Sequence, residues 1–255
     1  MPFNKIEQEK VASAIVRQIE SLILKGILRP GERLPSERDL AIKFEVSRPS
    51  VREAFCELET RGLVETRPGA GVYIAQVLGS AFSPALVALF SSHKEALYDY
   101  ITFRRDLEGM AAERAAVHAS ETDLDVIRSI FERMETAHLK RNPSEEAAID
   151  AEFHMAIVDA AHNIVMLHMM RSMFEMLQAG VFYNRSLLFE NRSTRTMLLD
   201  QHRAMFEAIV ARKPDRARAA VNAHLDFIEM AMRQQEQDAI HEATAKQRYA
   251  HEKGL

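Results

Sequence analysis

The amino-acid sequence predicts a mainly α-helical protein in two parts: an N-terminal winged helix-turn-helix with a small β-hairpin wing, and a C-terminal all-α antiparallel helical bundle. Two observations lead to this fold class. Residues 5–75 contain short helical patterns, then turn residues, then two short strand patterns. Residues 95–240 show only the periodicity of helices, with no strand pattern among them.

The stretch between the two parts differs in composition from both. It contains Gly79, Pro84 and several serines, which is typical of a linker with a short helix inside it. At the far end, the residues after about Gln235 are polar and are expected to fray. The predicted divisions are an N-terminal domain at 1–76, a linker at 77–95, a helical domain at 96–240 and a polar tail at 241–255.

The first two helices of the N-terminal part have clear ends. Ile15 and Ile19 lie on one face of a helix expected over residues 6–25, because they are four positions apart, and Gly26 ends it. Ser36 is expected to cap the second helix, with Asp39 at the capping-box position.

The third helix has a sharper start. Ser47 is the expected N-cap, and Val46 and Val51 can form a hydrophobic staple around it. Only a few residues around Glu45 separate this helix from the second one, which is the spacing of a helix-turn-helix. Gly62 ends the third helix.

Two strand patterns follow, at residues 63–67 and 72–75, and the turn between them contains Gly69 and Gly71. This hairpin is the wing of the predicted fold. Glycines at its tip would let the backbone come close to a phosphate, since they carry no side chain.

Long hydrogen-bond donors lie on the exposed face of the third helix. Arg48 and Arg52 are four residues apart and therefore share a face. Arginine can bind guanine or a phosphate through two parallel hydrogen bonds. We expect double-stranded DNA to be contacted by Arg38, Ser47, Arg48, Ser50, Arg52, Arg67 and Gly69. The alternative is a solvated surface on which the arginines only pair with Glu37, Glu53, Glu57 and Glu59.

The overall composition sets further limits. A net charge of −4 argues against a protein that binds polyanions non-specifically. No apolar run is long enough to span a membrane, and the first residues lack a signal peptide, so a reducing cytoplasm is expected. The single cysteine, Cys56, excludes an internal disulfide framework and a cysteine-cluster metal site, and it is expected to be a small core residue.

The C-terminal part is expected to contain about six helices. They are predicted near residues 97–117, 121–140, 144–161, 163–189, 193–212 and 214–236. Four polar residues fall on the apolar faces of these helices, where core side chains belong: Asp150, His154, His202 and His224.

These four residues could hold one divalent metal ion. A buried charge or unpaired imidazole is costly, and a cation would satisfy all four groups together. Asp150 and His154 can reach one ion from one helix face, and the ligand types suit Zn²⁺, Ni²⁺, Mn²⁺ or Fe²⁺. The alternative is that each histidine is a hydrogen-bonded core residue. Spacing alone leaves both interpretations open, because no spacing rule relates His202 to His224.

The N-terminal part resembles a known family. The stretches PGERLPSERDLA and FEVSRPSVREAFCELETRGLVETRPGAGVYI are similar to the winged-helix domain of GntR-type regulators, and the resemblance covers residues 8–75. In that family, the positions that correspond to Arg38, Arg48, Arg52 and the wing around Gly69 contact operator DNA. The resemblance therefore implies a transcriptional regulator.

The helical part resembles the FCD effector domain of the FadR subfamily, through AIDAEFHMAIVDAAHN and DQHRAMFEAIVARKPDRARAAVNAHLDFI. This resemblance implies a metal held by Asp150, His154, His202 and His224. The stretch FRRDLEGMAAERAA is similar to the Arg-x-x-Leu-Glu segment of the domain, which places Arg104 where an effector carboxylate binds. The alternative for Arg104 is a surface salt bridge with Glu108.

Within the subfamily, the stretches KIEQEKVASAIVRQIESLILKGILRPGERLP and AAHNIVMLHMMRSM resemble regulators of pyruvate dehydrogenase and of lactate or glycolate use. This implies a homodimeric regulator of carbon metabolism, expected to be a repressor, that binds a palindromic operator. Its effector would be a small 2-hydroxy or 2-keto acid, such as lactate, pyruvate or glycolate, bound at the metal.

A metalloenzyme that uses the same Asp/His₃ site on a small carboxylic acid is the alternative from another class. A catalytic zinc typically keeps three protein ligands and an open position. Here four protein ligands are expected, no general base stands out, and a di-iron bundle needs Glu-x-x-His pairs from two helices, which do not appear. The sequence therefore favours a regulator over an enzyme.

Overall fold

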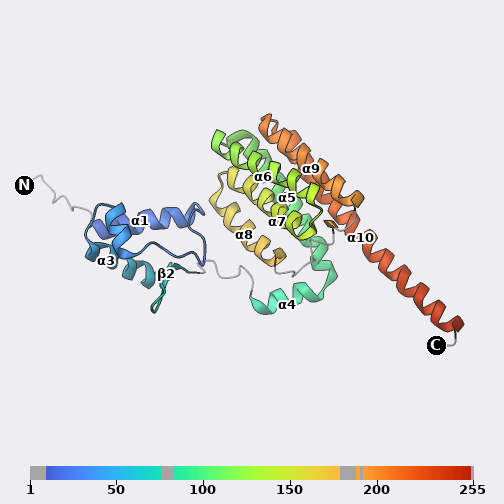
Figure 1. Ribbon diagram of the computed structural model, residues 1–255, viewed down its shortest axis with the longest axis horizontal. Helices are drawn as coiled ribbons and strands as arrows, with labels where there is room; N and C mark the ends of the chain where they lie inside the picture. Colours follow the sequence, from blue (N-terminus) through green and yellow to red (C-terminus); the bar gives the residue numbers. More distant parts are fainter. Residues whose placement is uncertain (1–9, 76–82, 179–187, 190–191, 254–255) are drawn as a thin grey trace, which may run out of the picture. The chain divides into compact units, whose positions relative to one another are not determined.

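The computed structural model describes residues 10–75, 83–178, 188–189 and 192–253. Backbone contacts divide the chain into two compact units, Met1–Phe82 and Ser83–Leu255. Figure 1 shows short helices and a hairpin in the first unit and long helices in the second. The predicted fold class is confirmed, because helices dominate both units and the strands form a single antiparallel hairpin among the described residues.

The first unit is a winged helix-turn-helix. Its elements are α1 (Val11–Leu24), α2 (Glu37–Lys43), α3 (Arg48–Thr60), β1 (Val64–Arg67) and β2 (Gly71–Ile74). The two strands pair antiparallel with Val64 opposite Ile74, and they form the wing. The helices close on an apolar core in which Val51 and Leu58 of α3 are fully buried.

Side-chain caps start α2 and α3 where the sequence predicts them. Ser36 Oγ accepts a hydrogen bond from the backbone N–H of Asp39 at 3.2 Å, and Ser47 Oγ accepts one from that of Ser50 at 3.3 Å. Glu45, between the two helices, has a φ of 54°, a left-handed conformation that reverses the chain in a short turn. The tight turn of the helix-turn-helix is therefore present.

The expectation that Cys56 is a core residue is wrong, because its side chain is exposed. Cys56 follows Arg52 by four positions and therefore lies on the same face of α3 as that arginine. The buried face of the helix is formed by Val51, Ala54, Phe55 and Leu58.

The second unit is a helical bundle. Its elements are α4 (Pro84–Ser92), α5 (Lys94–His118), α6 (Glu121–Lys140), α7 (Pro143–Ala160), α8 (Ile164–Gln178), α9 (Arg192–Val210) and α10 (Pro214–Lys253). Contacts join α5 to α7, α9 and α10, and α6 to α7 and α9, and Figure 1 shows this body of helices side by side. Residues 179–187, predicted as the end of one helix, lie outside the described residues. None of the described helices combines the length and hydrophobicity needed to cross a membrane.

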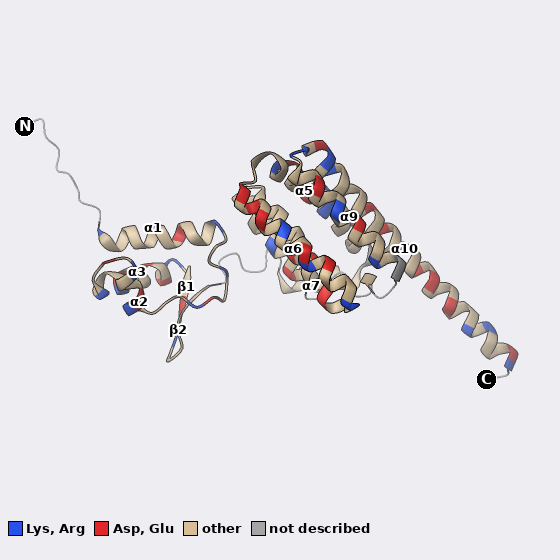
Figure 2. Ribbon diagram, turned by 45° about the horizontal axis from the view of Figure 1, so that its top comes forward, with Lys and Arg blue, Asp and Glu red and all other residues tan. Residues whose placement is uncertain are grey.

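The last helix is longer than the sequence predicts. A helix to about residue 236 with a frayed tail was expected, whereas α10 continues to Lys253. Its second half is rich in Ala, Glu, Gln, Lys and Arg, which are strong helix formers. Pairs four residues apart, such as Lys246 with Glu242, add support, and Figure 2 shows acidic and basic residues close together along this part of α10. The tail is polar, as expected, but its composition favours a helix.

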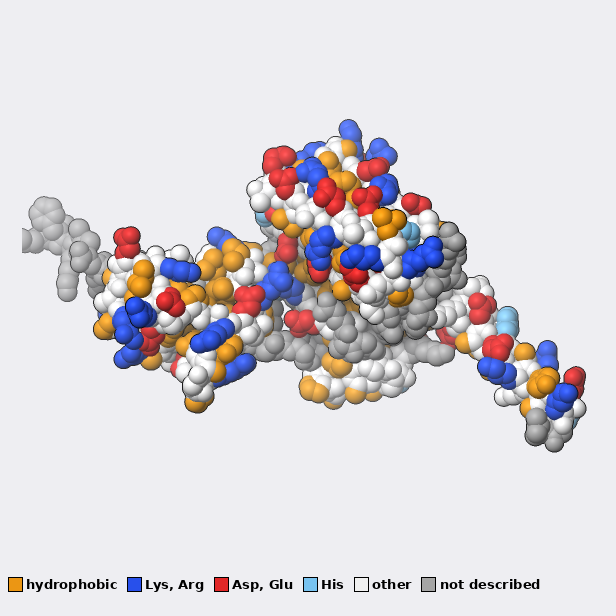
Figure 3. Space-filling model, viewed as in Figure 1, with side chains coloured by type: hydrophobic (Ala, Val, Ile, Leu, Met, Phe, Trp, Pro, Cys, Tyr) orange, Lys and Arg blue, Asp and Glu red, His pale blue; other side chains and the backbone are white. Residues whose placement is uncertain are grey.

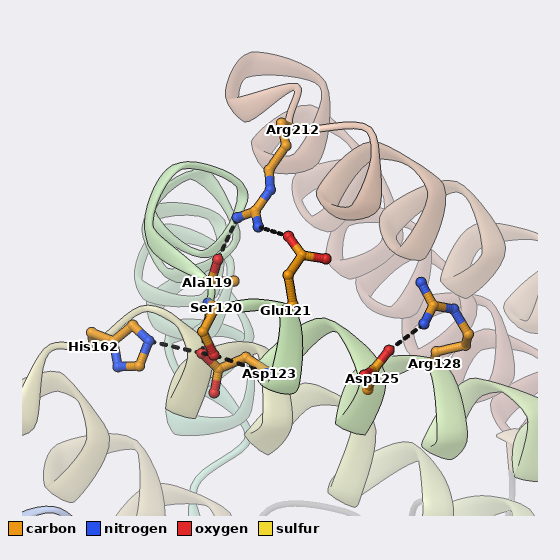
Figure 4. Close-up of polar contacts among 8 residues, drawn as sticks. All are labelled: Ala119, Ser120, Glu121, Asp123, Asp125, Arg128, His162 and Arg212. Atoms are coloured by element: carbon orange, nitrogen blue, oxygen red, sulfur yellow. Dashed lines mark hydrogen bonds and ion pairs between the residues drawn. The ribbon is translucent and has the colours of Figure 1, made fainter.

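The start of α6 is held by a network of polar contacts, shown in Figure 4. Ser120 and Asp123 form a capping box, in which each side chain accepts a hydrogen bond from the backbone N–H of the other residue. The same carboxylate lies 2.9 Å from Nε2 of His162, and Arg212 donates to the carbonyl of Ala119 at 2.5 Å. The network therefore joins the start of α6 to the turns that follow α7 and α9.

Replacing Asp123 by Ala should destabilise the protein by about 1–2 kcal/mol at neutral pH, because the cap of α6 and the contact with His162 are both lost. Burial raises the pKa of Asp123, but hydrogen bonds from Ser120 and His162 outweigh it, so the pKa lies below its ordinary value. The contribution is therefore complete above the unfolded-state pKa of about 4 and is lost as the pH falls through the lower folded-state pKa.

Urea unfolding of the wild type and the variant between pH 7 and pH 3 measures both effects. Asp125→Ala is the matched control, since Asp125 pairs only with Arg128 on the exposed face of the same helix and should cost less than about 0.5 kcal/mol. Equal losses in the two variants would contradict the capping role.

Candidate functional site

The predicted DNA-contacting residues of the first unit lie on α2, α3 and the wing. The side chains of Arg48 and Arg52 are 60% and 65% exposed. Ser47 and Arg38 are exposed, and Ser50 is half-buried at the start of α3. Figure 3 shows Lys and Arg side chains at several places on the visible face of the first unit, with acidic side chains between them. Long cationic donors therefore face solvent where a recognition helix needs them.

The wing presents a cation and a glycine in a left-handed backbone conformation. Arg67, at the end of β1, is half exposed, pairs with Glu65 and lies over the ring of Tyr73 at 4.2 Å. Gly69, between the strands, has a φ of 72°, which a residue with a side chain rarely adopts. The contact with Tyr73 holds the arginine next to the turn at the tip of the hairpin.

Glu37, at the first position of α2, organises the arginines of α3. Nε and Nη2 of Arg52 donate to its two carboxylate oxygens at 3.0 and 2.8 Å, and Nη2 of Arg48 lies 3.9 Å away. The hydrogen bond from Arg52 lowers the pKa of Glu37. Of the glutamates that are alternative partners for these arginines, Glu37 therefore does pair with them. An exposed pair is worth about 0–1 kcal/mol, so a nucleic acid can compete for the arginines.

The four predicted metal ligands meet in the core of the second unit. Asp150 and His154 lie on α7, His202 on α9 and His224 on α10, and all four are buried. Each offers one ligand atom, and these atoms lie within 4.8 Å of one another. Nε2 of His202 is 2.9 Å from Oδ1 of Asp150 and 3.3 Å from Nε2 of His154.

Neighbouring side chains orient two of the imidazoles. Nδ1 of His154 lies 2.6 Å from Oε2 of Glu108, and Nδ1 of His224 lies 2.9 Å from Oε1 of Gln201. Bonds at Nδ1 leave Nε2 of each ring as the atom for the cluster. Three imidazoles and one carboxylate, oriented by further polar groups, are a donor set that fits Zn²⁺, Ni²⁺, Mn²⁺ or Fe²⁺. The buried Asp/His₃ cluster is compatible with a metal site.

Several small residues of α5 lie in the core of the second unit. A Cβ atom on Gly109 of α5 would lie 2.5 Å from Oδ1 of Asn222 on α10, so a larger residue here would force the side chain of Asn222 to move. Asn222 is two residues before His224. Around the cluster, Ala111, Ala112, Ala115 and Ala116 of α5 are all buried.

Arg104 pairs with Glu108, but in the core of the second unit and not at the surface. It is completely buried, and its Nε donates to Oε1 of Glu108 at 2.6 Å. The rings of Phe174 and Tyr100 lie 5.0 and 5.9 Å from its guanidinium carbon. Burial raises the pKa of Glu108, but the charge of Arg104 and the hydrogen bonds from His154 and Arg104 outweigh it and lower the pKa to about 2. Arg104 is therefore part of the polar core that contains the Asp/His₃ cluster.

A small pocket adjoins the cluster on the side of His202. It is lined by Met134, His138, Glu146, Phe189, Arg195, Leu199 and His202. Inside it, Nε of Arg195 donates to both carboxylate oxygens of Glu146, at 2.9 and 3.0 Å, and Nη2 donates to the carbonyl of His138.

Glu146 and Arg195 were not predicted from the sequence, although a signal for both exists. Glu146 lies four residues before Asp150 and Arg195 seven before His202, so each shares a helix face with a predicted ligand. Glu108 is four residues after Arg104, but its contact with His154, like that of Gln201 with His224, joins two helices and has no such signal.

Comparison with known proteins assigns both units. The gntR family of bacterial regulatory proteins matches residues 11–74, and the FCD domain matches residues 99–227. The chain belongs to the GntR family. This GntR-family protein is 32% identical to an Escherichia coli (strain K12) protein that carries the name L-lactate dehydrogenase operon regulatory protein, over 92% of this chain and 91% of that one.

Two further relatives are similar over most of their length. The Glc operon transcriptional activator of Escherichia coli (strain K12) is 30% identical over 93% of this chain and 94% of its own. The HTH-type transcriptional regulator LutR of Bacillus subtilis is 32% identical over 82% of this chain and 94% of its own. The family and these relatives are transcriptional regulators, so this chain is a DNA-binding regulator and not an enzyme.

Solved structures share the fold. The Streptococcus agalactiae GntR structure is 24% identical with a TM-score of 0.52, over 87% of this chain and 100% of that one. Escherichia coli McbR/YncC is 18% identical with a TM-score of 0.50, over 90% of this chain and 100% of that one.

Proposed function

We propose that this GntR-family regulator binds a palindromic operator as a homodimer, and that a small carboxylic acid held at a metal in the FCD domain changes its affinity for DNA. The observation that carries the proposal is the buried cluster of Asp150, His154, His202 and His224, whose ligand atoms lie within 4.8 Å of one another. Such a regulator works beside the chromosome, in the cytoplasm.

In this proposal, α3 enters the major groove and the wing contacts the backbone. Arg48 and Arg52 reach base edges or phosphates, because both are long, exposed and on one face of α3. Two-fold symmetry of a dimer would place two such helices on the two halves of a palindrome. The full proposed contact set is Arg38, Ser47, Arg48, Ser50, Arg52, Arg67 and Gly69.

Asp150, His154, His202 and His224 would hold a divalent ion of the Zn²⁺, Ni²⁺, Mn²⁺ or Fe²⁺ type. The ion would act as a Lewis acid that binds the carboxylate and the neighbouring oxygen of a 2-hydroxy or 2-keto acid. Arg104, 2.6 Å from Glu108 in the same polar core, is the proposed cation for the effector carboxylate. We propose lactate, pyruvate or glycolate as the effector, because one relative is named for an L-lactate dehydrogenase operon.

We propose repression as the mode of regulation, with the acid releasing the operator. The acid must bind the two DNA-binding states with different affinity to shift their populations. A reporter gene behind the operator, with and without the acid, measures the direction. Higher expression in cells that lack this regulator supports repression, and lower expression contradicts it.

Replacing Arg52 by Ala should weaken operator binding about 5- to 150-fold, which corresponds to one lost bidentate contact of about 1–3 kcal/mol. Gel shifts at one fixed salt concentration measure it against operator and unrelated DNA. Arg61→Ala is the matched control, because Arg61 lies at the far end of α3 and pairs with Glu20 and Glu57. An unchanged shift for Arg52→Ala would remove Arg52 from the contact set.

Replacing His202 by Ala should remove the bound metal and the response to the acid together. His202 is within 2.9–3.3 Å of two other proposed ligands, so its replacement takes a ligand atom out of the middle of the cluster. Elemental analysis of the purified protein measures metal, and circular dichroism checks folding. His162→Ala is the control, since His162 is half exposed and contacts only Asp123. A folded His202→Ala protein with a full metal content would refute the assignment.

The effector class is tested by thermal shift of the metal-loaded protein. A 2-hydroxy or 2-keto acid at 100 times its Kd should stabilise the protein by about 2.7 kcal/mol, which raises its melting temperature by a few degrees. L-lactate, glycolate and pyruvate should shift the wild type, and the shift should vanish after chelation or in His202→Ala. Shifts that persist without metal would place the acid elsewhere.

A further inference from the structure

We propose that Glu108 is a positioning residue for the metal centre: it fixes the ring of His154 through one carboxylate oxygen while Arg104 holds the other. The inference rests on the proposed metal site, and it adds a regulatory link between that site and Arg104. Neither Glu108 nor the link follows from the ligand set itself.

Each oxygen of Glu108 lies 2.6 Å from a nitrogen atom of a different partner. Oε1 accepts from Nε of Arg104 at 2.6 Å, and Oε2 lies 2.6 Å from Nδ1 of His154. Arg104 and Glu108 are one turn apart on α5, and His154 comes from α7. All three side chains are at most 2% exposed, so water does not replace either contact.

The contact at Nδ1 determines what Nε2 of His154 can do. An imidazole that donates from Nδ1 to a carboxylate presents Nε2 as a lone pair, in a fixed ring orientation. For His154, that atom lies 3.3 Å from Nε2 of His202 and 3.8 Å from Oδ1 of Asp150. Glu108 therefore sets both the tautomer and the direction of this ligand without being a ligand.

Arg104 acts on the metal centre through the same carboxylate. Its Nε bond holds Glu108 in the rotamer that reaches His154, because the two residues lie on one face of α5. A carboxylic acid bound to Arg104 would share the guanidinium with Glu108 and so change the contact with His154. Metal affinity and acid affinity would then be linked, and each would change the other by the same factor.

The test is the metal affinity of Glu108→Gln and Glu108→Asp in the full-length protein. Gln keeps the shape of the Glu side chain but has one acceptor oxygen, whereas nitrogen atoms of both Arg104 and His154 lie close to the carboxylate. Asp keeps the charge but is too short to reach both partners. Removing a group that hydrogen-bonds a metal ligand typically lowers metal affinity 10- to 100-fold. We therefore expect the Zn²⁺ affinity of both variants to fall by about 10- to 100-fold, measured in competition with a chelating dye. The visible absorption of the Co²⁺-saturated variants should also shift.

Glu113→Gln is the matched control, because Glu113 lies on the same helix and pairs with the exposed Arg218 at 2.9 Å. Its Zn²⁺ affinity and Co²⁺ spectrum should equal those of the wild type. A purely structural role of Glu108 would lower the melting temperature but leave the spectrum of the saturated protein unchanged, and that result overturns the proposal.

The outcomes separate this inference from the proposed function. A wild type that binds no Zn²⁺ or Co²⁺ overturns both. A wild type that binds metal, with Glu108→Gln and Glu108→Asp within about twofold of it, overturns the role of Glu108 alone. Weaker metal binding, a shifted Co²⁺ spectrum and a smaller effect of L-lactate on metal affinity in both variants support it.

Discussion

The helical unit depends on satisfying several ionisable side chains that meet at one point in its core. A buried charge or imidazole without a partner costs several kcal/mol, which is a large part of the stability of a domain. Four helices therefore have to bring their polar groups to within bonding distance of one another. Glu108, Arg104 and Gln201 complete the set around the Asp/His₃ cluster. The close approach of α10 at Gly109 is part of the same solution.

The ion pairs of the two units differ in what they can do. In the N-terminal unit, the pair between Glu37 and Arg52 is exposed and therefore weak, so the arginine can exchange a carboxylate for DNA at little cost. In the helical unit, the pair between Arg104 and Glu108 is buried, and removing one partner would leave a charge in the core. The surface contacts suit reversible recognition, whereas the core contacts fix geometry.

Local patterns account for most of what the sequence predicted well. The caps at Ser36 and Ser47 depend on neighbouring residues, and the shared face of Asp150 and His154 follows from helix periodicity. That His202 meets His154 is a tertiary fact, which no spacing rule could give. The FCD resemblance implied that meeting, but it did not reveal the second bond of Glu108 or the bond from Gln201.

The failures have physical reasons as well. The polarity of the C-terminal tail predicts fraying, but the intrinsic helix propensity of its residues favours a helix to Lys253. Cys56 was assigned to the core from its residue type, whereas its position four residues after Arg52 places it on the exposed face. The pairing of Glu37 with Arg52 links residues on different helices, so neither helix pattern alone predicts it.

The length of α10 places its far end a long way from the Asp/His₃ cluster. His224 lies near the start of this helix, and at 1.5 Å per residue the axis from His224 to Lys253 is about 44 Å long. Figure 1 shows the far part of α10 extending beyond the other helices of the bundle. A tilt of about 5° at His224 would move the far end by about 4 Å. At the proposed metal site, a change in one coordination bond that tilts α10 by this amount would therefore be amplified along the helix to its far end, near Lys253.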